Sequence, residues 1–150
     1  MSLADQIQND TKAALLGGNR FAGDTLRGLK AAILNEEVAK GKRDTGLSDT
    51  EIEQIVAREV KKRYESIKLY EANDRPELAE PEKKEIEILE VYLPAQLSEE
   101  ELMGVIDEQI AALGADMSKM GQVIGAVKAK VGTAADGATI ATLVKQRLSK

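Results

Sequence analysis

The chain has 150 residues, a net charge of −5, only 3% aromatic residues, and neither cysteine nor histidine. This composition excludes disulfides, thiolate metal sites, cysteine nucleophiles and every mechanism in which a histidine acts as general base. The length allows one domain or two small ones, with a core of leucine, isoleucine, valine, alanine and methionine.

The amino-terminal residues do not have the pattern of an export signal. Residues 1–8 alternate between polar and apolar types and lack the apolar centre of a signal peptide. No other stretch is apolar for long enough to span a bilayer. We therefore expect a cytoplasmic protein that has no contact with membranes.

Helical periodicity begins near the start of the chain. Apolar residues at helical spacing predict a short helix from Leu3 to Leu15, which ends at residues 17–19 (Gly-Gly-Asn). Asp24 is typical of an N-cap, and the apolar residues after it predict a second helix that fades in the polar stretch 40–46.

Two longer helices are predicted next, and they should form a hairpin. Residues 48–51 (Ser-Asp-Thr-Glu) are a capping box that begins a helix running to Asn73. Pro76 suits the first turn of the following helix, which should end at Pro94 because proline cannot donate a backbone hydrogen bond. The short turn at residues 73–75 predicts that the two helices are antiparallel neighbours.

Residues 94–97 are the predicted linker between two domains, residues 1–93 and residues 98–150. Directly after the linker, residues 98–101 (Ser-Glu-Glu-Glu) form a second capping box. Three short helices follow, the first of which ends at Gly114. No segment has the pattern of a strand, so the predicted fold is all-α, with an N-terminal helical hairpin or bundle followed by a small three-helix C-terminal tail domain.

Charge is distributed unevenly along the chain. Residues 71–108 contain three basic and 13 acidic side chains, whereas residues 118–150 contain six basic and one acidic. A phosphate backbone is attracted to such a basic segment. Alternatively, the basic residues only solubilise small helices and complement the negative ends of the helix dipoles. The candidate nucleic-acid-binding residues are Lys119, Lys128, Lys130, Lys145 and Arg147, with Lys150 close to them in the sequence.

Two further motifs each permit two interpretations. Gly121 and Gly125 lie four residues apart on one helix face and allow close approach of another backbone. Packing against a helix of the tail is the favoured interpretation, and contact with an RNA backbone is the alternative. The segment 61–64 (Lys-Lys-Arg-Tyr) is a candidate nucleic-acid contact, but an exposed face supported by ion pairs explains it better.

The acidic side chains do not predict a catalytic or metal site. Adjacent carboxylates on a helix point in different directions, and the run Glu99–Glu101 is explained as favourable charge at a helix start. The sequence has no phosphate-binding glycine loop, no dinucleotide fingerprint and no zinc-ligand spacing. We expect no catalytic residue, no metal and no small-molecule cofactor.

A combination of short motifs runs through the whole chain. They are Tyr92–Leu102, Gly114-Ala115, Met120–Ile124, Ala135–Gly137 and Leu143–Lys145, preceded by Arg63, Ser66, Arg75 and Leu78. This combination resembles the GatB/YqeY family, whose stand-alone members are small helical proteins. One difference is Ile124, where the family often has methionine, a change that conserves volume.

The resemblance implies contact with tRNA and not catalysis. The tail of this family is similar to the C-terminal domain of the B subunit of the aminoacyl-tRNA amidotransferase, a glutamine-dependent carbon–nitrogen ligase that converts misacylated Glu-tRNA or Asp-tRNA to the amide form. In that enzyme the tail helps to hold tRNA, while ATP-dependent activation belongs to a larger domain that this chain lacks. The leading hypothesis is a non-catalytic tRNA-binding or tRNA-amidotransferase-related accessory protein, with tRNA or an aminoacyl-tRNA-handling enzyme as partner.

Two alternative functions stay open. The acidic hairpin at residues 71–90 predicts a protein-interaction adaptor that binds a basic partner. Carbon–nitrogen ligase activity of the chain itself follows from the family association. The missing histidine, cysteine and nucleotide-binding motifs argue against this second alternative.

Overall fold

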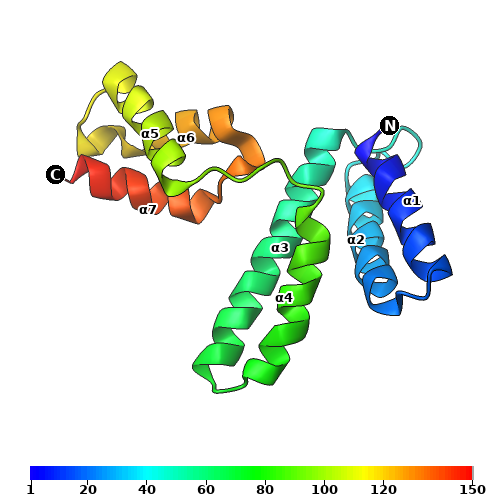
Figure 1. The fold of residues 1–150 in the computed structure, drawn as a ribbon. Helices are drawn as coiled ribbons and strands as arrows, with labels where there is room; N and C mark the ends of the chain where they lie inside the picture. Colours follow the sequence, from blue (N-terminus) through cyan, green and yellow to red (C-terminus); the bar gives the residue numbers. More distant parts are fainter. Residues whose placement is uncertain (150) are drawn as a thin grey trace. The chain divides into compact units, whose positions relative to one another are not determined.

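The computed structural model describes residues 1–149, so Lys150, one of the basic residues of the tail, lies outside the described part. Over these residues the chain forms seven α-helices and two short 3₁₀ helices and contains no strand (Figure 1). The all-α prediction is confirmed. The elements are α1 (Leu3–Leu16), α2 (Arg20–Ala39), α3 (Asp49–Ala72), α4 (Pro76–Glu90), α5 (Glu99–Leu113), η1 (Met117–Lys119), α6 (Met120–Val131), η2 (Gly132–Ala134) and α7 (Gly137–Leu148).

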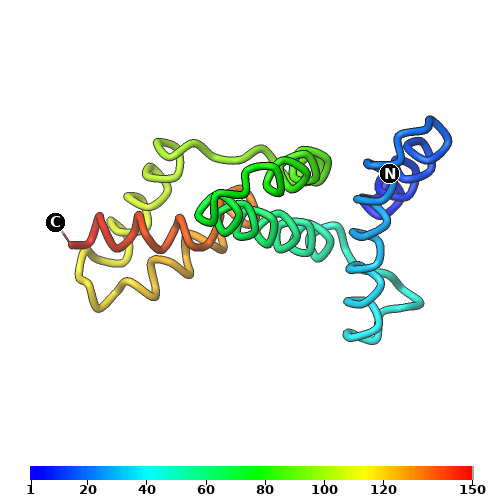
Figure 2. Tube along the Cα trace, turned by 90° about the horizontal axis from the view of Figure 1, so that it is seen from below, coloured from blue at the N-terminus to red at the C-terminus, as the bar shows by residue number. Residues whose placement is uncertain are grey.

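The helices belong to two compact units, Met1–Leu93 and Pro94–Lys150, each with a hydrophobic core of its own. In the N-terminal unit α1 packs against α2 and α3 packs against α4, while α2 also contacts α3 and α4. Figure 2 shows α3 (teal) and α4 (green) side by side. The core contains Leu29, Ile52, Val56 and Leu89, each at most 1% exposed, and burying such a side chain contributes about 1.5–3 kcal/mol.

The strongest helix-start signals of the sequence are confirmed. Ser48 Oγ accepts a hydrogen bond from the Glu51 amide at 3.2 Å, and Glu51 Oε1 accepts one from the Ser48 amide at 3.0 Å. Ser98 and Glu101 repeat this exchange with two distances of 3.1 Å. Pro76 is the first residue of α4, where its missing amide costs no helical hydrogen bond.

The predicted start of the second helix is wrong. Asn19 Oδ1 accepts a hydrogen bond from the Ala22 amide at 3.1 Å, so Asn19 is the N-cap and α2 begins at Arg20. Asp24 therefore lies inside the helix. Both residues can cap a helix, and the earlier one extends α2 by a turn in which Gly23 lies against the Leu15 side chain of α1.

The end of α4 also differs from the prediction. The helix ends at Glu90, four residues before Pro94. Tyr92 is only 5% exposed, and its hydroxyl donates a hydrogen bond to Asp10 Oδ2 at 2.6 Å. The change of direction that buries Tyr92 against α1, and not the proline, accompanies the end of this helix.

The C-terminal unit is built from α5, α6 and α7, which pack against one another. Its fully buried side chains are Ile106, Val123, Val127, Ile140 and Val144. The segment before α5 is attached to the loop between α6 and α7. The Leu97 amide donates to the Ala134 carbonyl at 2.9 Å, and Gln96 Nε2 donates to the Thr133 carbonyl at 3.0 Å.

Candidate functional site

The candidate nucleic-acid-binding side chains lie at helix ends in the C-terminal unit. Lys119 directly precedes α6, Lys128 and Lys130 belong to the last turn of α6, and Lys145 and Arg147 belong to the last turn of α7. Lys119 is half-buried and the other four are exposed.

Two of these five side chains are paired with carboxylates of α5. Arg147 donates to Asp107 through Nε at 2.8 Å and through Nη2 at 2.9 Å, and Lys130 Nζ lies 2.8 Å from Glu108 Oε2. The C-terminal unit as a whole has six basic and seven acidic residues, a net charge of −1. A count restricted to residues 118–150 therefore overstates the positive charge of this surface.

The other three lysines keep their charge available. Among residues 1–149, no carboxylate lies within ion-pair distance of Lys119, Lys128 or Lys145. Lys128 lies against the first turn of α7, where its Nζ is 3.4 Å from the position that a Cβ on Gly137 would take. Among the described residues of this unit, these three lysines are the cations available to an anionic ligand.

Gly121 and Gly125 lie on an open face of α6. A Cβ added at either position would meet no atom within 4 Å, and both residues are exposed. The favoured interpretation, close packing within the tail, is therefore wrong over the described residues. Gly121, Gly125 and Lys128 follow one another at helical spacing, so their backbone positions share one face of α6, and from that face the Lys128 side chain reaches to the first turn of α7.

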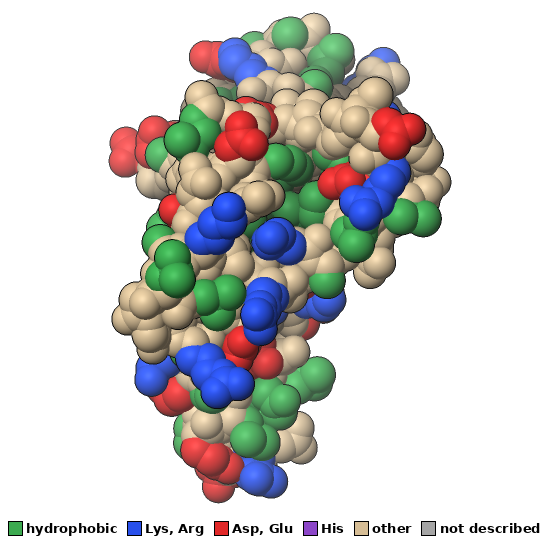
Figure 3. Space-filling model, turned by 90° about the vertical axis from the view of Figure 1, so that its right-hand side faces the viewer, with side chains coloured by type: hydrophobic (Ala, Val, Ile, Leu, Met, Phe, Trp, Pro, Cys, Tyr) green, Lys and Arg blue, Asp and Glu red, His purple; other side chains and the backbone are tan. Residues whose placement is uncertain are grey.

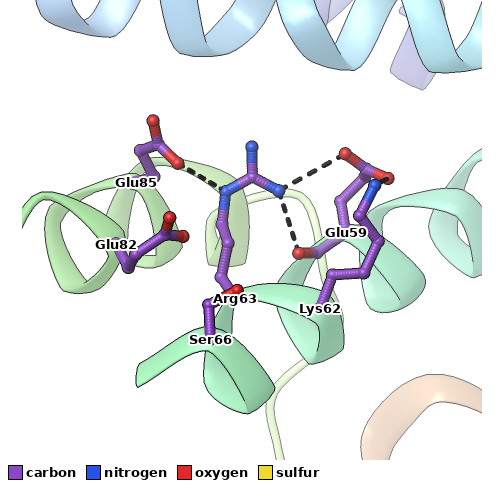
Figure 4. Close-up of a pocket in the computed structure, with 6 residues that line it drawn as sticks. All are labelled: Glu59, Lys62, Arg63, Ser66, Glu82 and Glu85. Carbon is purple, nitrogen blue, oxygen red and sulfur yellow. Dashed lines mark hydrogen bonds and ion pairs between the residues drawn. The ribbon is translucent and has the colours of Figure 1, made fainter. Parts of the chain in front are cut away.

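A hollow of about 180 Å³ lies between α3 and α4 in the N-terminal unit (Figure 4). Arg63 spans it, with Nε donating to Glu85 Oε2 at 2.7 Å and Nη1 donating to the Glu59 carbonyl oxygen at 2.9 Å. Burial opposes the charged guanidinium, but Glu85 and Glu59 outweigh it, so the pKa of Arg63 is raised. Burial, followed by the charge of Glu85, raises the pKa of Glu82 in the same hollow.

This hollow is best explained as an ion-pair network that joins the two helices. Lys62 also pairs with Glu59, at 3.1 Å, so the cations that line the hollow are already bound to carboxylates. Arg63 and Ser66, both part of the family resemblance, line this hollow between α3 and α4.

The basic segment 61–64 does not present its charges as a group. Arg63 turns into the hollow, Lys62 is paired, and the Tyr64 hydroxyl donates to Glu90 Oε1 at 3.1 Å. The ion-paired interpretation of this segment therefore holds, with Lys61 left on the outer face.

The acidic hairpin is partly neutralised in the same way. Glu77 lies 2.6 Å from Arg75 Nε, and Glu71 lies 3.7 Å from Lys83 Nζ. Two of the carboxylates that the adaptor alternative offers to a basic partner are thus already paired within the hairpin.

A second hollow, between α1 and α2, was missed by the sequence reasoning. Its volume is about 340 Å³ and its lining is mostly apolar. One sequence signal could have revealed this hollow. Leu34 and Val38 are apolar but lie on the exposed face of α2, whereas the side chains that α2 buries in the core lie on another face.

Two kinds of site do not occur in the described part of the chain. None of its helices combines the length and apolarity needed to cross a membrane. Among the same residues, no three acidic side chains are arranged to hold a metal ion.

Comparison with known proteins gives one family and several relatives. A family model described as Yqey-like protein matches residues 4–148. The chain is 29% identical over 102 residues to "Altered inheritance of mitochondria protein 41, mitochondrial" of Clavispora lusitaniae, covering 66% of this chain and 58% of the relative. It is 28% identical over 116 residues to the protein of the same name from Kluyveromyces lactis, covering 75% and 59%.

A third relative with this name, from Lachancea thermotolerans, is 32% identical over 88 residues, covering 58% of this chain and 46% of the relative. The chain thus spans less than two thirds of the length of the curated relatives it matches.

Proposed function

Because the chain belongs to the Yqey-like protein family, we propose that it is a non-catalytic tRNA-binding accessory protein that contacts tRNA through its C-terminal unit. The tail of this family resembles the domain that helps the aminoacyl-tRNA amidotransferase to hold tRNA. Lys119, Lys128 and Lys145, which have no carboxylate partner among residues 1–149, supply the positive charge that a phosphate backbone needs.

The observation that carries the proposal is the outward face of α6. Two glycines inside a short helix cost stability, and no side chain or backbone of the described chain uses the space they leave. An external backbone can approach this face closely. Lys128 on the same face and Lys119 at the helix start would hold its phosphates.

The proposal also gives the expected strength of the salt dependence. Three phosphate contacts correspond to a slope of roughly −2.1 to −2.7 in a plot of log affinity against log salt. The affinity for tRNA should therefore fall by roughly 20- to 40-fold between about 50 mM and about 200 mM salt.

A fluorescence titration of labelled tRNA with the full chain at these two salt concentrations tests the proposal. The variant with Lys119→Ala, Lys128→Ala and Lys145→Ala should bind weakly and have a much shallower slope. The control variant carries Lys61→Ala, Lys68→Ala and Lys84→Ala, which removes the same charge from exposed positions of the N-terminal unit.

The control variant should keep the wild-type slope. Absence of tRNA binding at the lower salt concentration, or equal losses in both variants, would contradict the proposal.

We assign the protein to the cytoplasm, where tRNA is abundant, and cell fractionation checks this. The word "mitochondrial" in the relatives' names describes the location of those proteins and is not transferred to this chain.

A further inference from the structure

The groove between α1 and α2 has an apolar interior at the surface of the N-terminal unit. Ile7 and Ile33 form its floor and are 1% and 8% exposed, so they also belong to the core. Ala4 and Ala31 are small wall residues, which leaves a depression of about 340 Å³. Leu34 completes the apolar part of the lining and is 38% exposed.

The apolar surface continues along α2 beyond the groove. Ala31, Leu34 and Val38 follow one another at spacings of three and four residues, and Val38 is 63% exposed. This is the spacing by which one helix packs along another. In the described part of the chain, α1 covers one side of α2, and the stripe of Leu34 and Val38 is left open to solvent.

Basic side chains lie at the edge of this apolar surface. Lys30 and Arg43 line the groove, and Glu37, the one carboxylate among its described lining residues, lies 3.9 Å from Arg43. One helical turn further along, Lys12 of α1 follows Gln8, and Arg27 of α2 precedes Ala31. Figure 3, which views the side of α1 and α2, shows basic side chains beside hydrophobic ones.

Two of these four cations, Lys12 and Lys30, are not compensated by a carboxylate of the described chain. No carboxylate among residues 1–149 lies within ion-pair distance of Lys12 or Lys30. Arg27 has only a distant contact with Asp24, at 3.9 Å between exposed groups. An apolar groove with uncompensated cations at its edge is complementary to an apolar stripe flanked by carboxylates.

We propose that the groove between α1 and α2 binds an acidic amphipathic helix of a partner protein. Apolar side chains of that helix, three or four residues apart, would fill the space over Ile7, Ala31 and Leu34 and continue to Val38. Its flanking Asp and Glu residues would pair with Lys30, Arg27 and Lys12. This binding mode is that of a helix lying in a groove, and it does not depend on binding of tRNA.

Two other occupants fit the groove less well. A nucleic acid backbone gains little from a floor of isoleucine and alanine, because its contacts are made by phosphate and sugar. A membrane surface requires apolar side chains over a whole outer helix face, whereas the exposed side of α1 carries Asp5, Gln8, Asn9 and Lys12. An acidic helix uses both the apolar groove and the positive edge.

Peptide binding to the full chain tests this inference, measured by fluorescence anisotropy. The probe is a labelled helical peptide with leucines along one face and glutamates beside them, and the matched peptide has lysine in place of every glutamate. The acidic peptide should bind with a dissociation constant in the micromolar range and more weakly as salt is raised. The basic peptide should not bind.

Two variants locate the binding surface. Leu34→Asp and Lys30→Glu should each weaken acidic-peptide binding by about tenfold or more. Leu34→Asp removes an apolar contact with the peptide, and Lys30→Glu replaces an attractive charge by one that repels the peptide's carboxylates. Matched controls are Leu69→Asp and Lys61→Glu on α3, both at exposed positions, which should leave binding unchanged. Lys30→Glu keeps the test valid if Leu34→Asp disturbs folding.

Several results would overturn the inference. These are absence of acidic-peptide binding, equal binding of both peptides, and equal effects of the α2 and α3 variants. Binding of anionic phosphatidylserine vesicles that Leu34→Asp abolishes, without peptide binding, would assign the groove to a membrane surface instead. Loss of tRNA binding in Lys30→Glu, without peptide binding, would assign it to nucleic acid.

Discussion

Replacing Gly125 by alanine should make the C-terminal unit more stable. Gly125 lies inside α6, and a Cβ at this position would meet no atom within 4 Å. Glycine inside a helix is about 0.5–1 kcal/mol less favourable than alanine, because it loses more backbone freedom on folding. For a unit of this size that gain raises the melting temperature by about 2–8 °C.

Gly132→Ala is a matched control in which the same chemical change should have the opposite effect. Gly132 caps α6 with a φ of 56° and a ψ of −128°, a backbone conformation that residues with a Cβ rarely adopt. Alanine there should cost about 1–3 kcal/mol.

The positions of the aromatic residues allow the two units to be followed separately. Phe21, Tyr64, Tyr70 and Tyr92 all lie in the N-terminal unit, and the C-terminal unit has no aromatic residue. Far-UV circular dichroism follows the helices of both units, whereas tyrosine fluorescence follows only the N-terminal one. If the units are independently folding domains, Gly125→Ala shifts a transition seen by circular dichroism and leaves the tyrosine transition unchanged.

A destabilised Gly125→Ala variant would refute this reasoning, because it would mean that some part of the protein or a second copy packs against that face. Binding gives a second readout. A Cβ on the outward face of α6 should weaken tRNA binding while stability rises, a combination that loss of structure cannot produce.

Three further predictions concern single contacts. Tyr92→Phe removes the hydrogen bond to Asp10 and should cost about 1–3 kcal/mol in urea unfolding followed by circular dichroism, and an unchanged midpoint would contradict the importance of this contact. Ser98→Ala removes an N-cap and should lower the stability of the C-terminal unit by about 0.5–2 kcal/mol, measured in the same way, while leaving the tyrosine signal unaffected. Hydrogen bonds from the Ser48 amide and two nearby lysines lower the pKa of Glu51 from 4.5 to about 2. The contribution of the Glu51 carboxylate to folding stability is therefore complete above pH 4.5 and is lost as the pH falls towards 2. On acidification the Glu51→Gln variant should lose less stability than the wild type.

The parts of the fold that followed from the sequence are those with a local cause. The capping boxes at Ser48 and Ser98 and the proline at the start of α4 each act within one helical turn, so the residues alone identify them. The end of α4 at Glu90 is followed by a contact between Tyr92 and Asp10, which are 82 residues apart. No local pattern contains that contact, whereas Pro94 is a local signal, so the sequence alone predicts the helix end at the proline.

The candidate site was also only partly predictable, because contacts with residues distant in the sequence determine which of its lysines are ion-paired. Lys130 and Lys128 are two residues apart and alike in the sequence, yet only Lys130 meets a carboxylate, Glu108 of α5. A count of charges along the chain assigns both to one basic segment, because Asp107 and Glu108 precede that segment in sequence.

Folding brings α5 against α6 and α7, so Lys130 and Arg147 become part of the unit's own ion pairs. Such exposed pairs contribute less than about 1 kcal/mol each to stability. These ion pairs nevertheless determine which basic side chains are available to a phosphate, because a phosphate can bind Lys130 or Arg147 only by displacing a carboxylate. The surface proposed for tRNA is therefore narrower than the five basic residues suggest, and its centre is the open face of α6 that carries Gly121, Gly125 and Lys128.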